Sequence, residues 1–233
     1  MTCTEIKNFQ PIGVITEMEK SKCRATTSGK TAMPTVLTIG HSTHPWKVFL
    51  ALLRAHRVER VIDVRSIPRS RHNPQFNQKA LRTKLRSARI SYVHLRKLGG
   101  LRHARRDSPN MGWRNNSFRG FADYMQTSEF NAGLQRLIKL ARQKRTALMC
   151  AEAVPWRCHR SLIADALTVL GIRVEDIMSK NRSQLHSLTS FARVRRRCIT
   201  YPGYKDDRLL SSDVRTAPKE KDPASPQKND ATI

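Results

Sequence analysis

Short β-branched runs alternate with amphipathic helical patterns through the middle of the chain, and this alternation constrains the fold more than any other feature. The strand-like runs are TVLTIG (35–40), VERVIDVRS (58–66), ISYVHL (90–95), TALMCAE (146–152) and RVEDIMS (173–179). Helical apolar spacing occupies residues 45–56, 76–89, 121–143 and 155–171. Strands that alternate with helices form parallel sheets covered on both faces. The sequence therefore predicts a three-layer α/β fold, with a mostly parallel sheet of about five strands and helices on both faces.

The composition changes on both sides of this repeating region. Residues 1–34 carry Thr, Ser, Gly and Lys clusters without a sustained period, which predicts a flexible leader. We expect residues 35–185 to form a single α/β domain and residues 186–210 to form a basic C-terminal extension. Pro, Ser, Asp and Lys dominate residues 211–233, and this composition predicts a disordered tail.

The charge balance is strongly positive, because 44 Lys and Arg against 18 Asp and Glu give a formal net charge of +26. Such an excess favours polyanions, so nucleic acid or a nucleotide is the expected partner; a merely basic surface would have the same composition. No apolar run reaches the roughly 18–20 residues that span a bilayer, and the chain starts without the apolar region of a signal peptide. The 5 cysteines lack regular spacing, which argues against a disulfide framework. We expect no membrane association and a cytoplasmic location.

Polar clusters follow four of the predicted strands at the point where each strand ends. They are GHST (40–43), DVRSIPRSRHNPQFN (63–77), HLRKLGG (94–100) and CAEAVPWRCHR (150–160). The carboxyl ends of parallel strands lie along one edge of a sheet, where open α/β sheets bind their ligands. The four clusters are therefore predicted to meet in one site.

The densest cluster is CAEAVPWRCHR, which precedes a helical pattern. Pro155 suits the first helical position, which places His159 near the centre of the buried face with Cys158 and Arg160 on its flanks. A polar first turn facing the sheet can bind an anion at the helix N-terminus. Glu152 can pair with Arg160 or act as a general acid or base. The alternative is structural, since buried free cysteines and histidines bonded to carbonyl groups are common.

The loops after the first two strands supply further candidates. In GHST, a glycine permits close backbone approach and the hydroxyl groups can cap a helix or hold a phosphate. In the second loop, Asp63 and Arg65 share one side of the strand and are predicted to pair. The catalytic candidates are Glu152, His159, Asp63 and Cys150. The ligand-binding candidates are Gly40, His41, Ser42, Arg65, Arg69, Ser70, His72, Cys158 and Arg160.

The cysteines suggest two other kinds of chemistry. A cysteine at a strand end before an arginine-bearing helix resembles the layout of tyrosine phosphatases and rhodaneses. Those phosphatases, however, place Arg where this chain has Trp156, and the loop lacks glycine to ring a phosphate. Metal ligands could come from Cys150, Cys158, His159, His41 and Asp63. No C-x-x-C or H-x-x-x-H spacing exists, so we expect no structural zinc site, although a site assembled across strands stays open. The sequence leaves the cofactor unknown.

The segment RKLGGLRHARRDSPNMGWRNNSFRG (96–120) has no clear period. Its arginines and aromatic side chains suit stacking on bases and contact with a phosphate backbone, or a lid over the edge site. These residues are Arg102, Arg105, Arg106, Trp113, Arg114, Phe118 and Arg119.

Several of these motifs together resemble the family catalogued as domain of unknown function 488. The similar stretches are TIGHST, VIDVRSIPRSRHNPQFN, LGG and CAEAVPWRCHRSLIADAL, within about residues 36–179. They include Ser66, Pro68 and Ser70 of a Ser-x-Pro-x-Ser loop, and the CHR triplet 158–160. The resemblance implies a small α/β domain and no particular reaction.

Three functions are consistent with the sequence. The first is an enzyme-like site that binds a phosphate-bearing ligand, nucleic acid or a nucleotide, through Arg65, Arg69 and Arg160. The second is a non-catalytic nucleic-acid-binding or regulatory module. The third is cysteine-dependent chemistry of the phosphatase or sulfurtransferase kind.

Overall fold

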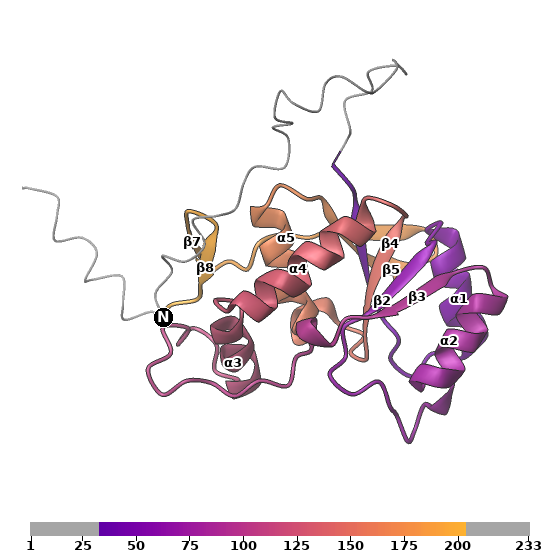
Figure 1. Ribbon diagram of the computed structural model, residues 1–233, viewed down its shortest axis with the longest axis horizontal. Helices are drawn as coiled ribbons and strands as arrows, with labels where there is room; N and C mark the ends of the chain where they lie inside the picture. Colours follow the sequence, from indigo (N-terminus) through magenta and orange to yellow (C-terminus); the bar gives the residue numbers. More distant parts are fainter. Residues whose placement is uncertain (1–32, 204–233) are drawn as a thin grey trace, which may run out of the picture. The chain divides into compact units, whose positions relative to one another are not determined.

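The computed structural model describes residues 33–203, and the expectations for residues 1–32 and 204–233 lie outside this range. Six strands form one sheet in the order β3-β2-β4-β1-β5-β6 (Figure 1). Five of them are mutually parallel: β1 (Val36–Gly40), β2 (Arg60–Asp63), β3 (Ser91–His94), β4 (Thr146–Cys150) and β5 (Val174–Ser179). The sixth, β6 (Arg182–Leu185), is antiparallel to β5. Three of its four residues are polar and most are exposed, so it has no apolar alternation by which the sequence could reveal it.

Helices cover both faces of the sheet, as predicted. Buried side chains of α1 (Trp46–Ala55) and α2 (Gln78–Ser87) pack with Leu37, Ile39 and Met149. The opposite core joins α3 (Asn116–Tyr124), α4 (Ser128–Ala141) and α5 (Arg160–Val169) to Val36, Leu148 and Cys150. Successive strand residues point to opposite faces, and each strand therefore contributes to both cores.

Two helical predictions need correction. The predicted helix over residues 121–143 is two helices, because Thr127 interrupts the pattern and caps α4 by accepting a hydrogen bond from the Phe130 amide. The helix expected to begin at Pro155 begins at Arg160. Pro155–Arg157 instead forms a short 3₁₀ turn, and Cys158 then has an extended backbone.

Residues 186–203 also pack on the domain. They include a two-stranded hairpin, β7 (Arg193–Arg195) and β8 (Cys198–Thr200). Ile199 and Tyr201 are buried in the same core as α3, α4 and α5. This segment thus adds apolar side chains as well as charge to the domain. No helix among residues 33–203 is long and apolar enough to cross a membrane.

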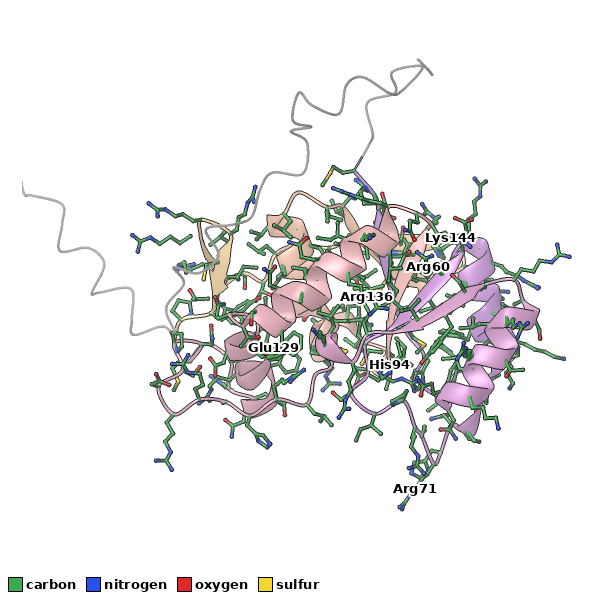
Figure 2. The ribbon with its side chains drawn as sticks, viewed as in Figure 1. Arg60, Arg71, His94, Glu129, Arg136 and Lys144 are labelled. Atoms are coloured by element: carbon green, nitrogen blue, oxygen red, sulfur yellow. The ribbon has the colours of Figure 1, made fainter. Side chains whose placement is uncertain are left out.

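The topology places a crevice between β1 and β4. These strands are neighbours, yet β1 continues into α1 on one face of the sheet and β4 leads to α5 on the other. Ligands of open α/β sheets bind at such a switch point, beyond the carboxyl ends of the strands. Figure 2 distinguishes the two edges: Arg60 and Lys144 lie near the amino ends of β2 and β4, and Arg71 projects from the loop beyond the carboxyl end of β2.

Candidate functional site

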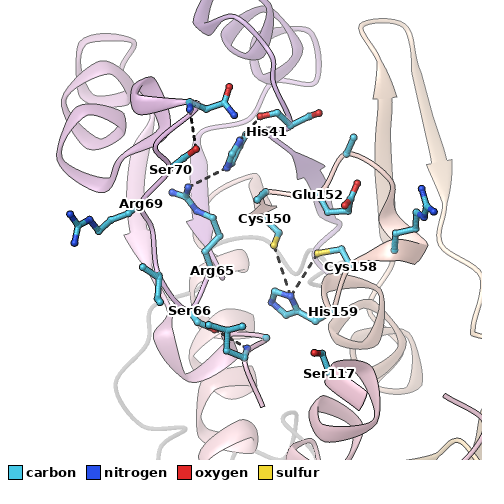
Figure 3. A pocket seen from close by; sticks show the side chains of 18 of the residues that line it. His41, Arg65, Ser66, Arg69, Ser70, Ser117, Cys150, Glu152, Cys158 and His159 are labelled. Atoms are coloured by element: carbon cyan, nitrogen blue, oxygen red, sulfur yellow. Dashed lines mark hydrogen bonds between the residues drawn. The ribbon is translucent and has the colours of Figure 1, made fainter. Parts of the chain in front are cut away.

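The loops after β1, β2 and β4 enclose a pocket of about 610 Å³ at the carboxyl edge (Figure 3). Its lining comes from segments 41–43, 65–73, 100–101, 117–118 and 150–159. These clusters therefore meet at one edge of the sheet, as the sequence predicts. Of the candidates named from the sequence, the pocket is lined by His41, Ser42, Arg65, Arg69, Ser70, Cys150, Glu152, Cys158 and His159.

His159 faces into this pocket from the residue that precedes α5. Its Nε2 lies 3.1 Å from the Val64 carbonyl oxygen, which can only accept, so Nε2 carries the proton. The edge of the ring packs against Phe121, with centroids 5.0 Å apart. The carbonyl and the phenyl ring fix the orientation of the imidazole, and its Nδ1 lone pair faces the two cysteines (Figure 3).

Both cysteines are buried free thiols that lie against this nitrogen. The distance to Nδ1 is 3.9 Å from Cys150 Sγ and 3.7 Å from Cys158 Sγ. A hydrogen bond from Cys158 holds the pKa of Cys150 well below its ordinary value, with His159 and Arg160 acting in the same direction against burial. The same hydrogen bond, together with burial, raises the pKa of Cys158. Cys150 is thus the sulfur that more readily becomes a thiolate.

Two glycines keep the site open by letting chain segments approach closely. A Cβ atom on Gly100 would lie 2.4 Å from His159 Nδ1. A Cβ on Gly40 would lie 1.9 Å from the Glu152 carbonyl oxygen. Gly40 therefore shapes the loop after β4 by contact with its backbone and is not among the lining residues.

Arg65 is held rigidly at the pocket wall. Its guanidinium is 2.6 Å from Asp63 Oδ2, and it also donates to the Phe76 carbonyl and to His41 Nε2. Asp63 is buried beneath it, receives a further hydrogen bond from Tyr92 and does not line the pocket. This pairing confirms the predicted Asp63–Arg65 contact and gives Asp63 a positioning role.

His41 is the partner that connects Arg65 to the first loop. Its Nδ1 donates to the Ser42 carbonyl oxygen, and its Nε2 accepts from Arg65. Burial lowers the pKa of His41, and the neighbouring Arg65 charge lowers it further. The ring also stacks on Phe76, with centroids 4.2 Å apart. His41 is therefore neutral near pH 7 and suited to orient Arg65.

Arg160 is placed away from the pocket. It is 1% exposed and donates to the main-chain carbonyls of Glu152 and Ala153 and to Thr38 Oγ1. The sequence suggested the Glu152 carboxylate as its partner, but the partner is the backbone of that residue. These bonds fix the loop after β4, so Arg160 supports the site without reaching a ligand.

The remaining candidates differ in their access to the pocket. The Glu152 side chain is exposed and lines the pocket. Arg69 lines it too, with its side chain extending away from the sulfur atoms in Figure 3, whereas the exposed His72 is not part of the lining. The Ser70 hydroxyl accepts from the Asn73 amide and stiffens the loop.

Several important neighbours had no signal in the sequence. Arg157 adds a cation to the pocket lining. Its side chain lies there because Pro155–Arg157 forms a 3₁₀ turn, where the sequence predicts the start of an α-helix. The Val64 carbonyl is a backbone group, which no residue pattern reveals. Phe121 belongs to a helix whose apolar face could be predicted, although its contact with His159 could not.

A basic groove lies beside the pocket. Its volume is about 660 Å³, and it shares Leu101 and Ser117 with the pocket lining. Four arginines line this groove: Arg102, Arg105, Arg106 and Arg119. The segment singled out for its arginines thus borders the edge site, while Trp113 packs inward against Phe191 and Tyr201.

Comparison with known proteins places the chain in a family but gives it no activity. The family described as Domain of unknown function DUF488 matches residues 45–167, more than half of the chain. No curated protein matches the chain, and no solved structure does.

Proposed function

The chain belongs to the DUF488 family, whose description names no reaction, and we propose from its pocket that it is an enzyme acting on a phosphate-bearing ligand, nucleic acid or a nucleotide. One observation carries the proposal: arginines and a converging Cys150, Cys158 and His159 line the same cavity at the carboxyl edge. Arginine forks bind phosphate, and the switch point of an α/β sheet is the usual ligand site.

The charges of the pocket favour an anion. Asp63 neutralises Arg65, but no acidic side chain in the described range pairs with Arg69 or Arg157. Both are exposed and can reach a phosphate without first losing a protein partner. Hydroxyl groups of Ser42 and Ser66 supply neutral donors in the same cavity.

The neighbouring groove favours a polymer over a single nucleotide. Arg106 is exposed, and Arg102 lies 3.5 Å above the centroid of the Tyr124 ring. Only one groove arginine is ion-paired among residues 33–203, namely Arg105 with Asp107. A ligand with several phosphates can therefore occupy the pocket and the groove together, as single-stranded nucleic acid does on basic surfaces.

Glu152 is the proton-transfer candidate for this reaction. Its carboxylate is exposed in the pocket and accepts a long hydrogen bond, 3.4 Å, from the Val154 amide. A carboxylate without a strong internal partner is available to a substrate or to a water molecule.

Binding is tested with a fluorescent single-stranded oligonucleotide, with labelled ATP in parallel, over a range of salt concentrations. We expect Arg69→Ala/Arg157→Ala to weaken binding about tenfold and to reduce the salt slope by about 2, because two phosphate contacts are lost. The matched control, Arg86→Ala/Arg136→Ala, removes the same charge from exposed positions on α2 and α4. Equal weakening by both pairs would mean that only the overall charge matters.

Turnover is tested separately with labelled DNA, RNA and nucleotides as substrates. Glu152→Gln is expected to abolish product formation while leaving oligonucleotide affinity within about twofold, because it removes a proton-transfer group and keeps the shape. Product formation at the original rate by this variant would exclude Glu152 as the acid or base.

A further inference from the structure

We propose that Cys150, Cys158 and His159 bind a zinc ion, or a similar thiophilic divalent cation, with an open coordination position toward the pocket. The proposal goes beyond the function above, since metal binding requires no phosphate ligand. Two thiolates, one imidazole and an exchangeable fourth ligand are a known set for catalytic zinc.

The first argument is the convergence of the donor atoms. The two sulfur atoms and Nδ1 of His159 lie within 4.8 Å of one another. Tetrahedral zinc with ordinary bond lengths needs sulfur–nitrogen separations of about 3.5 Å and a sulfur–sulfur separation of about 3.8 Å. The observed sulfur–nitrogen distances of 3.7 and 3.9 Å require shifts of only a few tenths of an ångström.

The second argument is hydrogen bonding. Nδ1 has one lone pair, because Nε2 carries the ring proton and donates it to the Val64 carbonyl. Cys158 donates its proton to Cys150, so Nδ1 receives at most one long contact from a thiol. A cation between the three atoms would replace these weak thiol hydrogen bonds with a bond from a lone pair of each donor.

The third argument is the support around the imidazole. Metal-binding histidines almost always donate their second ring N–H to a carbonyl or a carboxylate, which fixes the tautomer and the ring plane. Val64 is in that place, and Phe121 packs against the ring. The orientation that a metal ion requires is thus already set by the protein.

The fourth argument is charge and access. Two thiolates and a neutral imidazole balance a divalent cation, so the loaded site has no net charge to bury. All three residues line the pocket, and an ion between them is reachable from it. Its open position would accept water or a ligand oxygen beside Glu152, Ser42 and Arg65, which line the same cavity.

The spacing explains why the sequence named these three residues only among five possible ligands and did not single them out. Cys150 ends β4, and Cys158 and His159 follow the 3₁₀ turn after a gap of seven residues. Tight metal motifs bring their ligands together within one turn of chain. Here the loop after β4 brings them together, and Arg160 holds that loop by donating to the carbonyls of Glu152 and Ala153.

Cobalt(II) titration of the full-length, chelator-treated protein tests the proposal. We expect one equivalent to give the sulfur-to-cobalt charge-transfer band and the intense visible bands of a tetrahedral ion, with zinc displacing it. Cys150→Ser and Cys158→Ser should each lower the affinity by more than about 100-fold. The control is Arg86→Ala/Arg136→Ala, which changes exposed side chains on α2 and α4 away from the three donors and should leave the titration unchanged.

A second measurement needs no variant and covers the case in which a serine in the core disturbs folding. Zinc should protect Cys150 and Cys158 from iodoacetamide in peptide mass mapping, and X-ray absorption should give two sulfur neighbours and an imidazole per zinc. The proposal is overturned if wild-type protein gives no charge-transfer band, if the Arg86→Ala/Arg136→Ala control abolishes it, or if zinc leaves both thiols as reactive as before.

Discussion

Two histidines lie beside α5, and their surroundings are opposite in kind. His159, just before the helix, faces two weak thiol donors and an open pocket. His186 lies against Asp165 in the middle of the helix, with Nε2 2.8 Å from Oδ1. Asp165 also accepts hydrogen bonds from the Thr189 hydroxyl and from the Tyr201 hydroxyl. The hydrogen bonds of the His186 group, the satisfied group, are completed within the protein. In the His159 group, the open group, lone pairs of the imidazole nitrogen and of both sulfur atoms are by contrast directed at one point.

The two groups are joined by a short chain of side chains. Arg160, which fixes the loop after β4, donates to Thr38 Oγ1, and the Thr38 hydroxyl donates to Asp176. Asp176 Oδ2 lies 3.7 Å from His186 Nδ1. The His186 group is therefore connected, through Asp176, Thr38 and Arg160, to the loop that lines the pocket. Residue type and burial do not distinguish His159 from His186. The groups that their ring nitrogens face do distinguish them, and these groups indicate which histidine is free to bind a ligand.

The largest expected effect comes from breaking the satisfied group. Asp165→Ala leaves His186, Thr189 and Tyr201 without their shared acceptor in the core, and we expect a loss of about 3–5 kcal/mol of unfolding free energy. Urea denaturation measures it. Asp107→Ala removes the exposed partner of Arg105 and should cost far less, because solvent screens an exposed ion pair. Comparable losses in the two variants would show that the Asp165 network contributes no more than a surface pair.

The second effect is a pH dependence of stability that comes from His186. Burial by itself lowers the pKa of His186, but hydrogen bonds and attraction from Asp165 and Asp176 outweigh it and raise the pKa to about 9. The charged form stabilises the fold, so this contribution is present below the unfolded pKa of about 6.5 and is lost as pH rises through about 9. The total is about 3 kcal/mol.

The contribution of His186 is obtained by measuring the unfolding free energies of the wild type and His186→Gln between pH 6 and pH 10. The difference between the two proteins should be largest near the acidic end and should shrink toward pH 10. A difference that stays constant with pH would show that His186 does not change its charge in this range.

The third effect concerns the open group and metal removal. A ligand that binds only the folded state at about 100 times its dissociation constant stabilises by about 2.7 kcal/mol. We therefore expect zinc to raise the unfolding midpoint of the wild type and a chelator to reverse the increase. The stability of Cys158→Ser should respond to neither reagent. A zinc response of equal size in that variant would place the ion elsewhere in the chain.

The sequence predicted more of the fold than of the site. Alternating patterns identified five parallel strands, and shared-edge topology brought Arg65 and Cys150 into one pocket. The polar β6 was missed because an edge strand need not alternate. A carbonyl partner for His159 was one of the two alternatives that the sequence left open, but neither Val64 nor the carbonyl partners of Arg160 could be identified. Main-chain carbonyls depend on the path of the chain and have no residue signature.

The smallest expected effect tests whether the open group needs its exact shape. Gly100 lies so close to His159 that an added Cβ would be 2.4 Å from Nδ1 and 2.6 Å from Cγ of the ring. Gly100→Ala must therefore tilt or displace the imidazole, and we expect cobalt affinity to fall about tenfold, the cost of disturbing the support of a ligand. Spectroscopic titration measures this change, and urea denaturation in chelator reports the accompanying change in stability.

Gly171→Ala is the matched control for this variant. Gly171 has φ +78° and open space around its Cα, so alanine there introduces backbone strain of about 1 kcal/mol without touching the pocket. Its cobalt affinity should equal that of the wild type even though the fold is weakened. If Gly171→Ala lowers the affinity as much as Gly100→Ala does, metal binding follows global stability, and the contrast between the open and the satisfied histidine groups loses its basis. If only Gly100→Ala lowers the cobalt affinity, glycine is required at position 100 because the His159 imidazole occupies the space that a Cβ atom would need.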